Sequence, residues 1–178
     1  VNGGNLMKPY LVQEITDSDG NVVTEVEPTV VRQVVSEETS AEVCKILEQV
    51  VGDQTEGTGK NAYVAGYRIG GKTGTSTDTT KEVGTGEKEY IVSFIGVAPA
   101  DDPQIAILVL LDNPAPQSET GIYVSGGQMA APTVGKMMAD ILPYIGVEAE
   151  YTETEIENMD KTVPSITGLT LEEAESTL

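Results

Sequence analysis

Residues 66–76 read Gly-Tyr-Arg-Ile-Gly-Gly-Lys-Thr-Gly-Thr-Ser and place one lysine among hydroxyl side chains and closely spaced glycines. In an extended conformation neighbouring side chains point to opposite faces, so Lys72 lies on one face and Thr73 and Thr75 share the other. Two hydroxyls at this spacing can hold one carboxylate. Glycine weakens a strand and is typical of places where a ligand or another backbone comes close. The stretch therefore predicts a strand at the edge of a substrate cleft.

Two specific motifs fit these residues. One is the Lys-Thr-Gly element of serine acyl-transferases that act on penicillins and cell-wall peptides. The other is a P-loop, since Gly66, Gly71, Lys72 and Thr73 match its pattern. A P-loop needs an apolar helix immediately after the lysine, whereas residues 74–89 contain one large apolar side chain and three glycines. This favours the first motif, although Lys-Thr-Gly-Thr is also short enough to be an ordinary turn.

The composition argues against several classes of function. The formal net charge of -19 opposes phosphate backbones, so we expect no nucleic-acid partner. The longest apolar run, from Ile105 to Leu111, is far shorter than the roughly 20 residues that cross a bilayer. Histidine is absent, so acid–base chemistry within this chain falls to Lys, Asp, Glu or Tyr.

Hydrophobic periodicity predicts an α+β fold in which helices cover one antiparallel sheet. The predicted strands lie near 10–26, as a hairpin about an Asp-Ser-Asp-Gly-Asn turn, and at 66–76, 90–98 and 104–112. Both of the last two strands are almost continuously apolar, which predicts cover on both faces. The predicted helices are 37–51, with Ser36 as N-cap, and 130–142.

Several segments, in order along the chain, resemble class B penicillin-binding proteins. They are Val1–Gly4 with Pro9, the Gly57-Thr58-Gly59 and Ala62 positions, the stretch from Gly66 to Thr75, and the Gly-Gly-x-x-Ala-Ala-Pro pattern at 126–132. The resemblance implies a penicillin-binding protein/β-lactamase-like transpeptidase fold and peptidoglycan cross-linking. It also implies binding of stem peptides and β-lactams, contact with other cell-wall synthesis or division proteins, and no metal or organic cofactor.

The same resemblance suggests three segments. Residues 1–147 are expected to be the C-terminal portion of the transpeptidase domain, 148–161 an acidic linker, and 162–178 the beginning of a PASTA domain. The chain begins without Met and stops within a helix-like pattern, so we expect a piece of a longer protein. That protein would be anchored by an N-terminal segment on the extracytoplasmic face of the bacterial membrane.

The family's Ser-x-x-Lys and Ser-x-Asn patterns do not occur in these 178 residues. The resemblance therefore implies a nucleophilic serine elsewhere and assigns roles only to the Lys-Thr-Gly-Thr strand. Lys72 would stabilise charge, Thr73 and Thr75 would bind the substrate carboxylate, Gly74 would leave the edge accessible, and the Thr75 N–H would donate to the oxyanion. A non-catalytic module that binds cell-wall peptide is the alternative of a different class.

Overall fold

The computed structural model describes residues 1–78, 89–159 and 170. Its centre is a three-stranded antiparallel sheet, ordered β5-β6-β7, of Gly70–Thr77, Tyr90–Ala98 and Ile105–Asp112. Gln104 N–H donates to the Ala98 carbonyl (2.9 Å) and closes the β6–β7 connection. The strands at 90–98 and 104–112 and the α+β class are confirmed.

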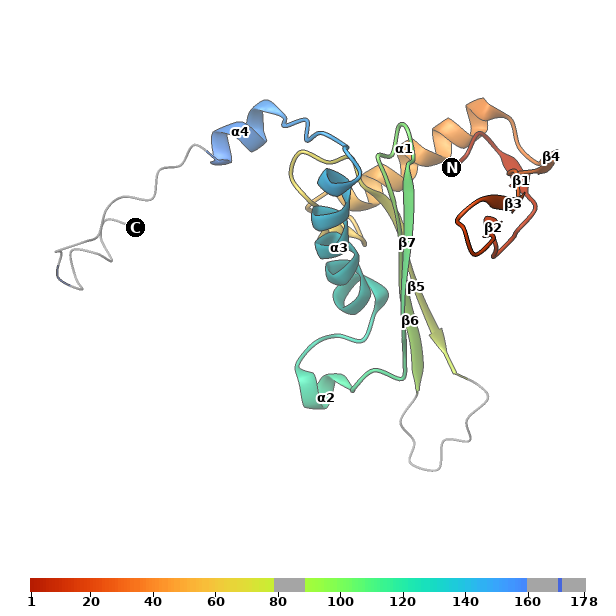
Figure 1. Cartoon of the computed structure of the whole chain (residues 1–178). Helices are drawn as coiled ribbons and strands as arrows, with labels where there is room; N and C mark the ends of the chain where they lie inside the picture. The colour runs from red at the N-terminus through yellow and green to blue at the C-terminus, as the bar shows by residue number, and fades with distance from the viewer. Residues whose placement is uncertain (79–88, 160–169, 171–178) are drawn as a thin grey trace.

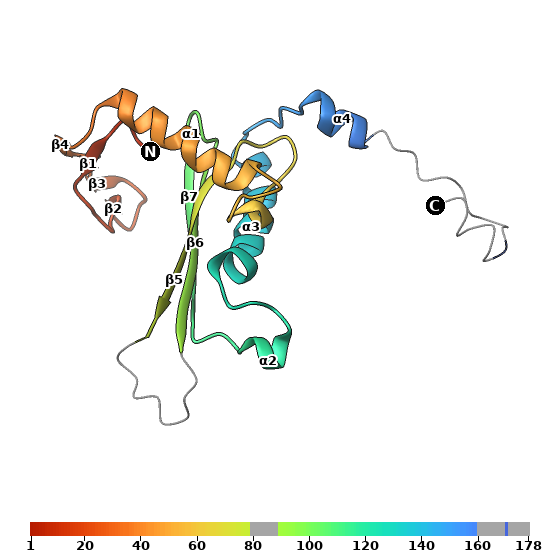
Figure 2. The same cartoon turned by 180° about the vertical axis from the view of Figure 1, so that it is seen from behind.

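Two helices pack on this sheet (Figures 1 and 2). Helix α1, Glu37–Gly52, begins at Ser36, whose hydroxyl accepts the Thr39 N–H at 3.1 Å. It crosses the sheet where β5 begins, with Leu47 against Gly70. Helix α3, Ala131–Tyr144, packs on the sheet at β6, where Val134 and Met138 lie against Gly96. Both predicted helices are confirmed.

The core lies between α3 and one face of the sheet. Its largest fully buried side chains are Phe94, Met138, Leu142, Val51, Val92 and Val134. The opposite face is open along β7, where Leu108 and Leu110 are 62% and 55% exposed. The prediction that the apolar strands are covered on both faces is therefore wrong for β7, which is an edge strand of the described sheet.

The N-terminal hairpin is real but does not join the central sheet. β2, Glu14–Thr16, pairs only with β3, Val22–Glu25, around the predicted turn, where the Asp17 carboxylate accepts the Asp19 and Asn21 N–H groups (2.9 Å each). A second pair, β1 (Asn5–Met7) with β4 (Val30–Gln33), joins this module to the start of α1. The prediction of one sheet that includes residues 10–26 was thus wrong.

The site strand also begins later than predicted. Residues 64–67 form a turn in which Gly66 has φ +79° and the Tyr67 N–H donates to the Val64 carbonyl (3.1 Å). Left-handed backbone at Gly66 cannot continue a strand. β5 consequently starts at Gly70 and continues to Thr77.

The predicted linker, residues 148–161, contains helix α4, Glu153–Met159, and is hydrogen-bonded to Tyr63 and Gly66. Thr152 and Glu155 form a reciprocal capping box: the Thr152 N–H donates to Glu155 Oε2 (2.6 Å) and the Glu155 N–H to Thr152 Oγ1 (3.3 Å). Glu155 Oε1 also accepts the Tyr63 hydroxyl and the Gly66 N–H (3.0 Å), and Glu150 N–H donates to the Gly66 carbonyl (2.7 Å). We call residues 149–155 the clasp. The proposed PASTA segment, residues 162–178, lies outside the described residues apart from Thr170.

Candidate functional site

Strand β5 presents a free backbone edge on the side away from β6. The β5–β6 register pairs Thr73 with Phe94 and Thr75 with Val92 without a shift, and the Asp78 N–H donates to the Glu89 carbonyl (2.9 Å). Antiparallel pairs alternate, so the even-numbered residues of β5 bond to β6. The N–H and C=O groups of Thr73 and Thr75 consequently point outward, at an edge to which no other described strand is bonded.

The Lys72 ammonium lies at this same edge. Its side chain is exposed, and Nζ donates to the Thr73 carbonyl (3.0 Å) and to Thr73 Oγ1 (3.3 Å). The outward-pointing Thr73 carbonyl thereby holds the cation beside the backbone edge. A positive charge and the Thr75 N–H thus belong to one surface of the molecule.

A turn of π-helix, Gly126–Ala130, packs against β5 at Thr75. It begins at Ser125, whose hydroxyl accepts the Gln128 N–H (3.3 Å), and its first residue, Gly126, donates its N–H to Thr75 Oγ1 (3.4 Å). Thr73 Oγ1 likewise accepts from the lysine, which has no acceptor atom. Both hydroxyls are therefore acceptors toward the protein, and no acceptor for either proton lies among the described residues. Two O–H donors remain for an anionic ligand.

Glycines allow the turn to lie directly on the strand. A Cβ at Gly126 would lie 2.0 Å from the Ser93 carbonyl oxygen and 2.8 Å from that of Gly74, and one at Gly127 would lie 2.3 Å from the Thr58 carbonyl oxygen. At Gly74 the first contact would be Ser93 Oγ, at 2.5 Å. From the sequence, Gly126 and Gly127 stand out only as part of the Gly-Gly-x-x-Ala-Ala-Pro pattern, because their contact with the strand joins residues about 50 positions apart.

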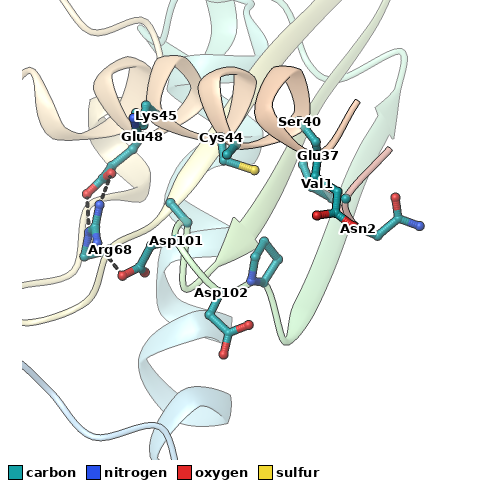
Figure 3. Close-up of a pocket in the computed structure, with 14 residues that line it drawn as sticks. Val1, Asn2, Glu37, Ser40, Cys44, Lys45, Glu48, Arg68, Asp101 and Asp102 are labelled. Atoms are coloured by element: carbon teal, nitrogen blue, oxygen red, sulfur yellow. Dashed lines mark hydrogen bonds and ion pairs between the residues drawn. The ribbon is translucent and has the colours of Figure 1, made fainter. Parts of the chain in front are cut away.

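A cavity lined by charged groups lies elsewhere. It has a volume of about 400 Å³ beside the N-terminal half of α1, and none of its lining residues belongs to β5 (Figure 3). At its rim Arg68 forms a two-point ion pair with Glu48 (2.7 Å for each bond) and a second pair with Asp101. The hydrogen bonds to Glu48 and the two carboxylate charges raise the Arg68 pKa further above its usual value. These pairs tie α1 to the turn before β5 and to the β6–β7 connection.

The described residues show no group of three or more His, Cys, Asp or Glu side chains that could bind a metal ion. Nor does any described helix have the length and apolar content needed to cross a membrane. The P-loop alternative is wrong: β5 is antiparallel to β6 and continues as a strand through Thr77, so no helix N-terminus follows Lys72.

Comparison with known proteins agrees with this architecture. The family model for the penicillin-binding protein transpeptidase domain matches residues 1–139. The chain has the sheet, helices and Lys-Thr-Gly edge strand of an acyl-transferase fold, and it belongs to the penicillin-binding protein transpeptidase domain family.

Two relatives show how similar the chain is to curated proteins. Stage V sporulation protein D of Bacillus subtilis is 44% identical over 184 residues, which cover 100% of this chain and 27% of that protein. Penicillin-binding protein PbpB of Mycobacterium tuberculosis is 36% identical over 137 residues, covering 74% of this chain and 19% of that protein. The chain thus spans 27% and 19% of the length of these two relatives.

Solved structures carry the same fold. Penicillin-binding protein 3 of Mycobacterium tuberculosis, crystallised with ampicillin, superposes with a TM-score of 0.68 and 30% identity, covering 85% of this chain and 34% of that one. The D,D-transpeptidase domain of a peptidoglycan glycosyltransferase from Eggerthella lenta gives a TM-score of 0.61 and 26% identity, covering 83% and 30%. The expected penicillin-binding protein/β-lactamase-like fold is confirmed.

Proposed function

We propose that this chain is the C-terminal part of a transpeptidase that cross-links peptidoglycan through a serine acyl-enzyme, with the serine outside these 178 residues. The donor would be a stem peptide ending in D-alanyl-D-alanine, and the acceptor an amine of a neighbouring stem. The observation that carries the proposal is the free edge of β5, which joins the Lys72 ammonium, two hydroxyl donors and the outward Thr75 N–H. Family membership supports the same chemistry.

Each group suits one part of acyl transfer. The Thr73 and Thr75 protons would bind the terminal carboxylate of the stem peptide, or the carboxylate of a β-lactam, with the Lys72 charge beside them. The Thr75 N–H would be one of two oxyanion donors, and loss of such a donor typically slows acyl transfer about 10²-fold or more. Gly74 would leave the strand edge accessible to the substrate. No step assigned to these residues requires a metal or organic cofactor.

The remaining features of the proposal concern the whole protein. It would be anchored on the extracytoplasmic face of a bacterial membrane by a segment preceding this chain, and it would bind β-lactams, as the Mycobacterium tuberculosis protein does in its ampicillin complex. Other cell-wall synthesis or division proteins would be its partners. A non-catalytic wall-binding module has no specific observation in its favour.

The test is turnover of a stem peptide by the full-length protein. We expect release of D-alanine in the presence of an acceptor amine, and a kcat at least about tenfold lower for Lys72→Ala, because the lost charge stabilises the tetrahedral intermediate more than the bound substrate. Lys136→Ala, an exposed lysine of α3, removes the same charge and should leave kcat unchanged. Absence of D-alanine release by the unsubstituted protein, or equal rates for both variants, would contradict the proposal.

A further inference from the structure

Asn61 connects the loop of residues 57–62 to the π-helical turn that touches the site strand. It lies in the short 3-10 turn Lys60–Ala62, and its Nδ2 donates to the Gly127 carbonyl (2.9 Å) in a partly buried position. The turn around Asn61 is itself fixed, because Ala62 is fully buried and its backbone lies against Gly135 of α3.

The contacts continue from Gly127 to the site. A Cβ at Gly127 would lie between the Thr58 carbonyl oxygen (2.3 Å) and Thr73 Cγ2 (3.4 Å), so loop, turn and strand are stacked without space between them. The adjacent Gly126 lies on the backbone of Gly74 and gives its N–H to Thr75 Oγ1. Asn61 therefore bonds to the carbonyl of Gly127, the residue that follows the one whose N–H orients the Thr75 hydroxyl.

The length of the hydrogen bond between Gly126 and Thr75 makes this connection sensitive to small displacements of the turn. At 3.4 Å it lies at the long end for a hydrogen bond, so a further shift of a few tenths of an ångström would break it. If Thr75 lost this donor, its hydroxyl would be free to rotate and its proton would no longer be directed to a ligand carboxylate. Among the described residues, the Asn61 side chain makes the one hydrogen bond from the 57–62 loop to this turn.

Building on the proposed function, we propose that Asn61 is a positioning residue for acylation. It holds the Gly126–Gly127 turn in place, and the turn orients the Thr75 hydroxyl. Asn61 touches neither substrate nor the reacting atoms. Its replacement should lower the rate constant of acylation at saturating ligand, with a smaller effect on the ligand concentration that gives half-saturation.

The experiment measures acylation of the full-length protein by a fluorescent penicillin over a range of concentrations. Asn61→Asp keeps the size of the side chain but replaces the donor with an oxygen that repels the Gly127 carbonyl. We expect acylation about tenfold slower or more, as is typical when a reacting group is misplaced, without an equal loss in melting temperature. The matched control is Lys60→Ala, on the same turn, whose Nζ bonds only to the Thr55 carbonyl among the described residues; it should acylate at the unsubstituted rate.

The same substitution made in a Thr75→Val protein separates a positioning role of Asn61 from an effect on overall stability. In Thr75→Val, which lacks the hydroxyl, Asn61→Asp should slow acylation by no more than about twofold, because the interaction through which it acts is already missing. An equal factor in both backgrounds, or an unchanged rate for Asn61→Asp alone, would overturn the inference while leaving the proposed function intact. Failure of the unsubstituted protein to acylate would overturn both.

Discussion

At the level of single residues, the oxygen and the proton of the Thr75 hydroxyl have different roles. Its oxygen accepts the Gly126 N–H, and its proton has no acceptor among the described residues. Thr73 is arranged in the same way by Lys72. A hydroxyl that already accepts from the protein is oriented to donate outward, which is the orientation that the proposed carboxylate-binding role requires.

Substitutions at Thr75 test this orientation. Thr75→Val keeps the shape but removes the donor, and we expect acylation by a carboxylate-bearing β-lactam to be about tenfold to a hundredfold less efficient, as for loss of a hydrogen bond to a charged group. Thr75→Ser should retain most of the efficiency. Thr77→Val, at an exposed position on the same strand, controls for the added apolar surface. Equal efficiencies for Thr75→Val and the unsubstituted protein would show that the hydroxyl does not bind the ligand.

At the level of elements, the contact between the π-helical turn and β5 depends on the absence of side chains. A Cβ at Gly126 would overlap the Ser93 backbone, whereas a Cβ at Gly52, the last residue of α1, would meet no atom within 4 Å. The two glycines thus offer a matched pair, one in a close approach and one in open space.

We expect Gly126→Ala to lower the free energy of unfolding by at least about 2 kcal/mol, because backbone must move to relieve the overlap. Gly52→Ala should be neutral or stabilising by up to about 1 kcal/mol, as the helix loses less conformational entropy on folding. Denaturant titration of both variants measures the difference. Similar stabilities would mean that the turn does not pack on the strand as described.

The clasp provides an element-scale prediction with a defined pH dependence. Hydrogen bonds from Tyr63 and from backbone N–H groups lower the Glu155 pKa to about 2, below its ordinary 4.5, while burial and Glu155 raise the Tyr63 pKa to about 12. Because the folded pKa of Glu155 is depressed, its contribution to stability is present above about pH 4.5 and is lost as the pH falls toward 2.

Glu155→Gln should therefore lower the free energy of unfolding by about 1 kcal/mol near pH 7, an amount typical of partly exposed charged hydrogen bonds. The difference should disappear near pH 2. Glu153→Gln, in the first turn of the same helix, removes an equal charge and should have little effect. Thermal melting at several pH values compares the three proteins, and a Glu155→Gln deficit that persists unchanged at pH 2 would contradict the assignment.

Local patterns predicted most of the elements but not their partners. Apolar spacing and the Ser36 cap located α1, and the apolar runs located β6 and β7. The Thr152–Glu155 capping box could also have revealed α4, but the acidic composition favoured a linker. The contacts of Gly126 with β5, of Asn61 with Gly127 and of Arg68 with Asp101 join distant segments, so no local pattern could have found them.

For the whole molecule, the charge and topology together exclude nucleotide binding at Lys72. The strand continues past the lysine instead of opening a helix, and the net charge of -19 opposes a polyphosphate. Calorimetric titration with ATP or GTP and Mg²⁺ should show no binding. Micromolar, magnesium-dependent affinity would restore the P-loop interpretation.

We propose that these residues form one wall of an acyl-transfer site whose nucleophile lies outside the chain. The most direct measurement is labelling with fluorescent penicillin, followed by peptide mapping of the adduct, for the isolated chain, the full-length protein and its Lys72→Ala variant. Covalent catalysis needs a nucleophile within reach of its activating base. We predict a serine-linked adduct only in the full-length protein, outside residues 1–178, and much slower labelling of Lys72→Ala. A penicilloyl serine on the isolated chain, or an unchanged rate for Lys72→Ala, would contradict the account.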